Sequence, residues 1–225
     1  SFKGGFECFP IQTLGQNGLV EDCFVSQLQG DYISAFIGAW RGIIRRCTVI
    51  FPARPADKSF PHWQGLTIAN GDQTIIEDST SIRRNKFLNC LCGISMEFHN
   101  DTDPTRGIEG SIFEDNEITL DSAWDQNLSA ITINNANQPH DLLPIDPSAI
   151  RNIVFRRNTV TTSGNPAYSS AINMATMADG SDPRVGIHNI DLVDNIFQDG
   201  MFYRNFGNNA KNITVSPTQP TWITT

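Results

Sequence analysis

Ionisable side chains of the kinds used in catalysis gather in one short stretch of the sequence. Glu97, His99, Asp101 and Asp103 alternate with other residues, and Arg106 follows them. Hydrolysis of a glycoside needs two carboxyl groups, one of which is kept protonated as the acid. Elimination from a uronic acid instead needs a base, together with a cation that neutralises the sugar carboxylate. The stretch holds groups that suit either chemistry.

A second stretch adds His140 and Asp141, which are adjacent in the sequence. The candidate carboxylates for hydrolysis are Glu97, Asp101, Asp103 and Asp141. The candidate bases for an elimination are His99, His140 and Arg106. In that case the neutralising cation would be Arg204 or a calcium ion.

These carboxylates differ in their local sequence. Asp103 precedes Pro104, and aspartates before proline or glycine commonly serve tight turns. A turn role is therefore the simpler explanation for each loop aspartate taken singly. Glu97 differs because it lies in a segment with strand alternation, where glutamate is a poor strand former. A functional role is thus easier to argue for Glu97.

The elements that would position these residues are repeated along the chain. Six segments share an apolar residue, two mostly charged residues, Asn or Cys, any residue, and an apolar residue. The Asn or Cys falls at Cys23, Cys47, Asn85, Asn116, Asn158 and Asn195. A second short element lies between them and contains Gly65–Ile68, Gly93–Met96, Ala130–Ile133, Ala171–Met174 and Gly200–Tyr203. Both elements show the alternation of short β-strands.

Superposition of the second elements places their residues in columns. We expect apolar columns to face inward, among them Leu66, Ile94, Ile131, Ile172 and Met201, and Ile68, Met96, Ile133, Met174 and Tyr203. Two columns then face outward. One contains Thr67, Ser95, Thr132, Asn173 and Phe202, and the other contains Ala69, Glu97, Asn134, Ala175 and Arg204.

Long irregular connections precede and follow this element, and they would wall a groove along the outward columns. The candidate substrate-binding residues there are Asn134, Asn173, Arg106, Arg204, Trp63 and Trp124. The two tryptophans would stack on sugar faces. An extended polymer suits such a groove, because each repeat supplies a further subsite.

A strand of four or five residues cannot bury its apolar face alone, whereas stacked identical coils can. We therefore predict an all-β fold, a single right-handed parallel β-helix of about six to seven coils with an Asn/Cys ladder. Residues 1–225 form one domain, in which 216–225 are a C-terminal tail that departs from the repeat. The chain begins inside an apolar-rich pattern, as a processed or trimmed N-terminus would.

The aligned Asn85, Asn116, Asn158 and Asn195 resemble the asparagine ladder of the pectin-lyase-like superfamily of right-handed parallel β-helices. In that family the ladder lies in a tight turn between the second and third strands of each coil, where stacked amides satisfy buried polar groups. The resemblance implies a secreted, extracellular or cell-surface protein that acts on a polysaccharide or oligosaccharide. It leaves the reaction open, because this fold hosts many chemistries.

The composition of the chain limits the kinds of partner that we expect it to bind. The net charge is -8 and only 18% of the residues are charged, so we expect no nucleic-acid partner. No apolar run approaches the length of a membrane span, so we expect no membrane partner. An acidic chain also disfavours a polyanionic ligand, unless an arginine cluster or a bound cation offsets the charge. The five cysteines contain no CxxC pair and are expected to be buried free thiols.

Charged pairs precede most of the Asn and Cys positions, for example Arg45-Arg46 and Glu114-Asp115. An arginine patch for an anionic sugar is one interpretation. Ion pairs between neighbouring coils are the simpler one, because the rows mostly set opposite charges side by side.

Three hypotheses for function follow. The first is a polysaccharide-active enzyme, either a glycoside hydrolase or a polysaccharide lyase. The second is a non-catalytic glycan-binding or adhesion module, which the absence of a complete family catalytic motif favours. The third is a phage tailspike-type β-helix, which would be a homotrimer, whereas the first two fit a monomer.

Overall fold

The chain is all-β in the part that the computed structural model describes. These residues are 7–8, 11–13, 18–26, 32–39, 42–51, 62–70, 81–90, 92–98, 108–120, 128–135, 150–163, 165–176, 187–205, 210–216 and 222–224. Within these ranges the strands form three parallel sheets, and the one helical element is a short 3-10 helix, η2 (Pro166–Tyr168).

Sheet A, the longest, contains β1 (Glu7–Cys8), β2 (Ile11–Thr13), β5 (Tyr32–Ala39), β8 (His62–Asn70), β11 (Cys92–Phe98), β15 (Leu128–Asn135), β18 (Ser169–Thr176), β21 (Phe202–Asn205) and β23 (Trp222–Thr224). Sheet B contains β3 (Leu19–Glu21), β6 (Ile43–Arg45), β9 (Ser81–Arg83), β12 (Ile108–Glu109), β13 (Ile112–Glu114), β16 (Ile150–Arg156), β19 (Ile187–Val193) and β22 (Ala210–Ser216). Sheet C contains β4 (Phe24–Ser26), β7 (Thr48–Ile50), β10 (Lys86–Cys90), β14 (Glu117–Leu120), β17 (Thr159–Thr162) and β20 (Ile196–Phe197).

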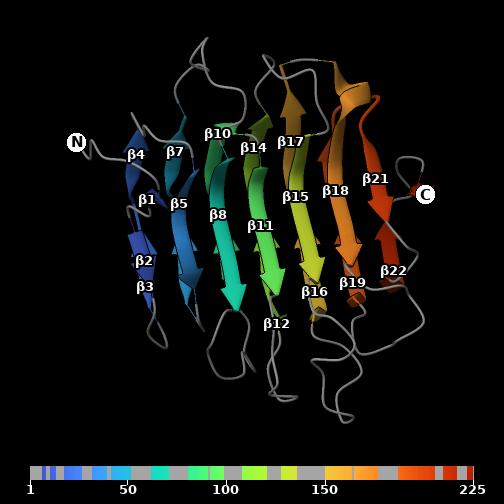
Figure 1. Cartoon of the computed structure of the whole chain (residues 1–225), viewed down its shortest axis with the longest axis horizontal. Coiled ribbons are helices and arrows are strands. Elements are labelled where there is room, and N and C mark those ends of the chain that lie inside the picture. The colour runs from blue at the N-terminus through green and yellow to red at the C-terminus, as the bar shows by residue number, and fades with distance from the viewer. Residues whose placement is uncertain are drawn as a thin grey trace.

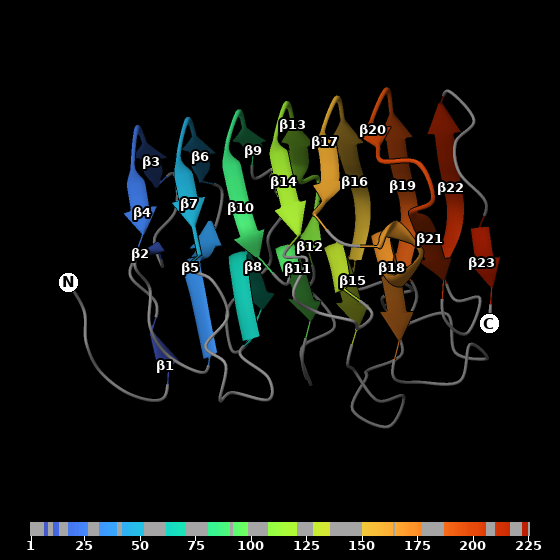
Figure 2. The ribbon, with the colours of Figure 1, turned by 90° about the horizontal axis from the view of Figure 1, so that it is seen from above.

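The chain visits the sheets in a repeating order. From β3 to β21 it passes from sheet B to sheet C and then to sheet A, and each new strand pairs in parallel with a strand of an adjacent repeat. Figures 1 and 2 show the result, with strands laid side by side along the long axis and the two termini at opposite ends. Residues far apart in the sequence but equivalent in the repeat therefore become neighbours.

The turn from sheet B to sheet C has one conformation in six repeats. Its first residue has positive φ, between 51° and 56°, at Asp22, Arg46, Arg84, Asp115, Arg157 and Asp194. The next residue is the predicted Asn or Cys. Asp and Asn tolerate the left-handed region better than most residues, whereas Arg accepts it at some cost. The predicted position of the ladder, in the turn between two strands, is confirmed.

The asparagine ladder is continuous and satisfies its own polar groups. Asn85 Nδ2 donates to Asn116 Oδ1 at 3.1 Å, and Asn116 Nδ2 donates to Asn158 Oδ1 at 2.9 Å. Asn158 Nδ2 donates to Asn195 Oδ1 at 2.9 Å. Each accepting oxygen also receives the backbone N–H of the preceding ladder residue, and Cys47 N–H donates to Asn85 Oδ1 in the same way.

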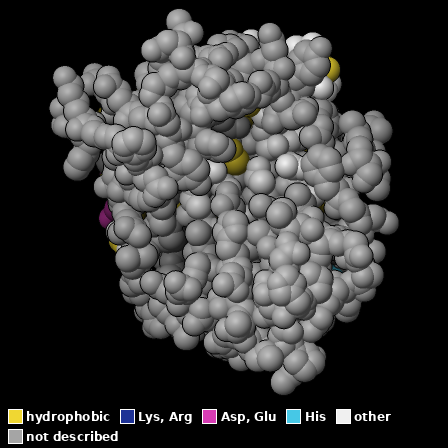
Figure 3. Space-filling view, in the orientation of Figure 1, with side chains coloured by type: hydrophobic (Ala, Val, Ile, Leu, Met, Phe, Trp, Pro, Cys, Tyr) yellow, Lys and Arg dark blue, Asp and Glu magenta, His cyan; other side chains and the backbone are white. Residues whose placement is uncertain are grey.

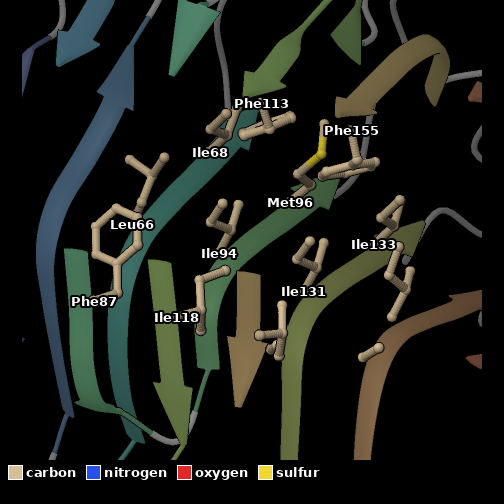
Figure 4. Close-up of a cluster of buried hydrophobic side chains, with 14 of the residues drawn as sticks. Leu66, Ile68, Phe87, Ile94, Met96, Phe113, Ile118, Ile131, Ile133 and Phe155 are labelled. Carbon is tan, nitrogen blue, oxygen red and sulfur yellow. The ribbon is translucent and has the colours of Figure 1, made fainter. Parts of the chain in front are cut away.

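The core lies between the three sheets. Inward residues of sheet A stack in the predicted columns, as Leu66, Ile94 and Ile131 do in the strand register. Figure 4 shows these columns facing apolar side chains from sheets B and C. Phe113 and Phe155 stack there with ring centroids 4.8 Å apart. Such columns bury apolar surface from one repeat to the next.

One expectation near the C-terminus is wrong. Arg204 is in register with Asn173, and Tyr203 with Ile172, so the expected register of this strand is off by two residues. Gly200 was aligned with the inward glycines of the other strands, but it has a positive φ of 87° and precedes β21, which begins at Phe202. In the tail, β23 pairs in parallel with β21 at the end of sheet A.

Candidate functional site

Strands β8, β11, β15 and β18 bend at the same point. Gly65 and Leu66 both face inward although they are consecutive, and so do Gly93 and Ile94. A Cβ atom on Gly65 would lie 2.4 Å from Phe87 Cδ1, and one on Gly93 would lie 2.5 Å from Ile118 Cγ2. Glycine is needed at both positions because there is no room for a side chain.

The residues on either side of the bend converge on the outer face of sheet A. We call this row the polar trough, and its members are Gln64, Thr67, Cys92, Ser95, Ser129, Thr132, Ser170 and Asn173. Thr67 Oγ1 hydrogen-bonds to Gln64 Oε1 across the bend, and Cys92 Sγ lies 3.6 Å from Thr132 Oγ1 on the next strand. Ser129 and Ser170 hydroxyls lie 2.6 Å apart. The trough thus crosses four neighbouring strands.

The trough is partly covered. Thr67 and Ser95 were expected to face outward, and they do leave the core, but they are only 5% and 1% exposed. Thr67 is covered in part by Gln64, to which it hydrogen-bonds across the bend. Cys92, Ser129, Thr132 and Asn173 are half-buried. Near the middle of this face, Figure 3 shows atoms of apolar side chains in yellow among grey residues that are not described.

Asn173 is the one member of the trough with an unsatisfied buried atom. Its Oδ1 has almost no contact with solvent and no hydrogen-bond partner. A buried acceptor without a donor costs about 1–3 kcal/mol. Such atoms in a native structure call for an explanation. Other atoms of Asn173 are partly exposed, whereas Oδ1 is not.

The strand register places several of the predicted site residues. Glu97 on β11 is in register with Asn134 on β15, as expected, and the two lie two residues after Ser95 and Thr132 of the trough. Arg204 lies beside Asn173 instead of in the column of Glu97. Trp63 is in register with Ile33 on β5. The structure describes these residues by their strand positions and not by their side chains.

The other predicted site residues lie outside the described residues. They are His99, Asp101, Asp103, Arg106, Trp124, His140 and Asp141. Their roles stay predictions.

The charged rows lie on a different corner of the molecule and pair among themselves. Arg46 Nη2 lies 2.6 Å from Asp22 Oδ2 and also contacts Glu21. Hydrogen bonds from Arg45 and then Arg46 hold the pKa of Glu21 below its ordinary value, and the hydrogen bond from Arg46 does the same for Asp22. The interpretation as ion pairs between repeats is confirmed for these rows.

The same arrangement recurs three repeats farther along. Arg156 Nε lies 2.5 Å from Glu114 Oε2, and Arg157 Nε lies 2.8 Å from Asp115 Oδ1. Hydrogen bonding from Arg157 lowers the pKa of Asp115. Here the acidic pair and the basic pair come from sheet B strands in direct register.

Sequence reasoning missed a second row of asparagines, on the surface where the chain enters sheet B. Asn212 Nδ2 donates to Asn189 Oδ1 at 3.1 Å, and Asn189 Nδ2 donates to Asn152 Oδ1 at 2.9 Å. Asn152 Nδ2 then donates to Glu109 Oε1. The three asparagines are exposed and have positive φ. The signal was present as Ile150-Arg-Asn-Ile153 and Ile187-His-Asn-Ile190.

Within the described ranges no three His, Cys, Asp or Glu side chains come together as metal ligands would. The same ranges contain no helix with the length and hydropathy to cross a membrane.

Comparisons with known proteins give no relative. No protein-family model, no curated protein and no solved structure matches the chain. The geometry of sheet A is therefore the basis for a proposed function.

Proposed function

We propose that the chain is a right-handed parallel β-helix of the pectin-lyase-like kind, and that it is an extracellular enzyme that cuts a polysaccharide. Three parallel sheets visited in a fixed order, with an asparagine ladder at one corner, support the fold. The polysaccharide would lie along the outer face of sheet A, across the strands.

The observation that carries this proposal is the polar trough. It contains hydroxyl, amide and thiol groups on four successive strands, with neighbouring strands about 4.8 Å apart, and its members Cys92, Ser129, Thr132 and Asn173 are partly exposed. A repeating row of uncharged donors and acceptors matches a polymer whose hydroxyl groups also repeat. The unpaired Oδ1 of Asn173 adds an acceptor that no protein group satisfies.

Glu97 is the candidate for the chemistry. It lies on β11, the strand that carries Cys92 and Ser95, and it is in register with Asn134. A carboxyl group beside a sugar-binding row could act as the general acid or base of a glycosidase. Its partner carboxylate would come from a loop, where Asp101, Asp103 and Asp141 are the predicted candidates.

Incubation with a panel of neutral and uronic-acid polysaccharides tests the proposal. We expect new reducing ends from at least one polymer, and ultraviolet absorbance of unsaturated products would identify an elimination. Glu97→Gln should abolish at least about nine-tenths of the activity, because it removes an acid–base group worth about a hundredfold or more in rate.

Glu117→Gln is the matched control. Glu117 lies on sheet C in an exposed ion pair with Lys86, where its loss should leave activity unchanged. Full activity of Glu97→Gln would remove Glu97 from the site. Absence of cleavage on the whole panel, with folded protein that still binds a polymer, would instead indicate a binding module.

A further inference from the structure

Cys23 and Cys47 occupy consecutive positions in the ladder, whereas the four later positions carry asparagine. Strands β3 and β6 pair before this turn and β4 and β7 pair after it, with the same offset along the chain. That offset places Cys23 directly beside Cys47. The Thr48 N–H donates to the Cys23 carbonyl at 2.8 Å, and this bond fixes the two backbones next to each other.

The two sulfur atoms lie in equivalent places of their turns. Cys23 Sγ donates to the Glu21 carbonyl and Cys47 Sγ donates to the Arg45 carbonyl, both at 3.4 Å. The two thiols are also hydrogen-bonding neighbours of each other. Strands in register are about 4.8 Å apart, which is within the Cα separation of about 4.4–6.8 Å that a disulfide needs. Rotation about the Cα–Cβ bonds can therefore join the sulfurs while the backbone stays in register.

The two thiols differ in their access to solvent. Cys23 is half-buried and Cys47 is buried, and both are free in this structure. Burial is the main cause that raises the pKa of the Cys47 thiol to about 11, and the Cys23 thiol adds to this, while the Cys23 backbone N–H opposes it. A soluble oxidant therefore meets Cys23 first, and Cys47 reacts afterwards from inside the turn.

The pair also lies at one end of the described sheets. Strands β3 and β4 are the end strands of sheets B and C in the described part of the chain, so each has one paired neighbour there. Phe24 and Leu19 on these strands are 67% and 52% exposed. A repeat at the end of a stack opens more readily than an inner one, because it has fewer neighbours. A covalent bond to the next repeat would restrict that opening.

We propose that Cys23 and Cys47 form a disulfide in an oxidising medium, and that this bond stabilises the repeat that contains β3 and β4. The inference is independent of the proposed function.

Oxidised glutathione can serve as the oxidant. The Cys23 thiolate attacks one glutathione sulfur and breaks the glutathione disulfide, and the released glutathione takes up the proton that Cys23 lost. The Cys47 thiolate then attacks the Cys23 sulfur of the mixed disulfide and displaces the second glutathione, which takes up the Cys47 proton. Two protein thiols are oxidised, and one glutathione disulfide is reduced to two thiols.

Equilibration of the whole chain with mixtures of oxidised and reduced glutathione tests the inference. The remaining thiols would be alkylated, and the protein would be digested without reduction by trypsin and a glutamate-specific protease. Cleavage after Glu21 separates Cys8 from Cys23, so linked peptides can be assigned by mass. We expect a bond between Cys23 and Cys47 that reduction removes. Cys92, which is also half-buried, should take no part in it.

Hydrogen exchange of β3 and β4 measures the effect of the bond on the end repeat. Their amides should exchange about tenfold more slowly in the oxidised protein than in the reduced one, because the bond limits local opening. Cys47→Ser cannot form the bond and should exchange equally in both glutathione mixtures. Cys92→Ser is the matched control, and it should keep both the bond and the slower exchange.

Two chemical outcomes would overturn the inference. One is a glutathione adduct at Cys23 without a bond to Cys47, and the other is a disulfide from Cys23 to a different cysteine. Equal exchange of β3 and β4 in the oxidised and reduced wild type, with the bond present, would overturn its stabilising role.

Discussion

At the scale of single residues, the role of an asparagine side chain depends on its surroundings in the fold. In Asn85 and Asn116 the amide is buried and bonded on both sides, and in Asn152 and Asn189 it is exposed and bonded along a surface row. Asn173 has the same amide with its oxygen buried and unpaired. The chemistry of the residue is identical in each place, so the difference in role comes from the position in the repeat.

Among the residues that the structure describes, Ser111 also has a buried side-chain atom without a partner. Its Oγ is unpaired and the residue is fully buried, at a position where neighbouring repeats place Ile153 and Ile190. Ser111→Ala should raise the free energy of unfolding by about 1 kcal/mol, because it removes an unsatisfied hydroxyl and keeps the backbone bond from Val154. Denaturant unfolding would measure the change.

Ser163→Ala is the control for this prediction. The Ser163 hydroxyl donates to the Leu120 carbonyl at 3.3 Å, so its loss should leave stability unchanged or slightly lower it. A loss of stability in Ser111→Ala as large as that in Ser163→Ala would show that the Ser111 hydroxyl has a partner.

At the scale of elements, the turn between sheets B and C holds the repeats together. Asn116 Oδ1 accepts from both the backbone N–H and the Nδ2 of Asn85, and Asn116 Nδ2 donates to Asn158. Asn116→Ala should lower the free energy of unfolding by about 3–5 kcal/mol, because it leaves buried donors and an acceptor without partners.

The exposed row supplies a matched control for the ladder. Asn189→Ala also removes amide hydrogen bonds, but water can replace them, so the loss should stay below about 1 kcal/mol. Equal stability of Asn116→Ala and Asn189→Ala would show that burial does not explain how the ladder stabilises the fold.

At the scale of the whole molecule, the repeat was predictable and the site only in part. The charged pair before Cys47, Asn85 and Asn116 predicted where the turn between sheets B and C lies. This was possible because the turn has the same local conformation and ladder contact in successive repeats. The inward column of Leu66, Ile94 and Ile131 was predictable from the in–out alternation of residues along a strand.

The bend was not predictable, because it depends on Phe87 and Ile118 from another sheet filling the space beside Gly65 and Gly93. The in–out alternation of a regular strand does not include such a bend. It therefore predicts that Thr67 and Ser95 are more exposed than they are. The register of Arg204 was missed because Gly200 resembles the inward glycines of the other strands in sequence, whereas it has positive φ and lies before β21.

Alkylation of cysteines tests the central claim, that a glycan binds along the polar trough. Cys92 is a half-buried member of the trough, and Cys23 is half-buried at the ladder turn. Cys47 is buried, which raises the pKa of its thiol to about 11, so it should react slowly throughout. The rate at each cysteine would be followed by peptide mass spectrometry, with and without a saturating amount of a polysaccharide that the protein binds. The account predicts that the polymer slows alkylation of Cys92 and leaves Cys23 unchanged. An unchanged rate at Cys92 with the polymer bound, or equal slowing at both cysteines, would contradict it.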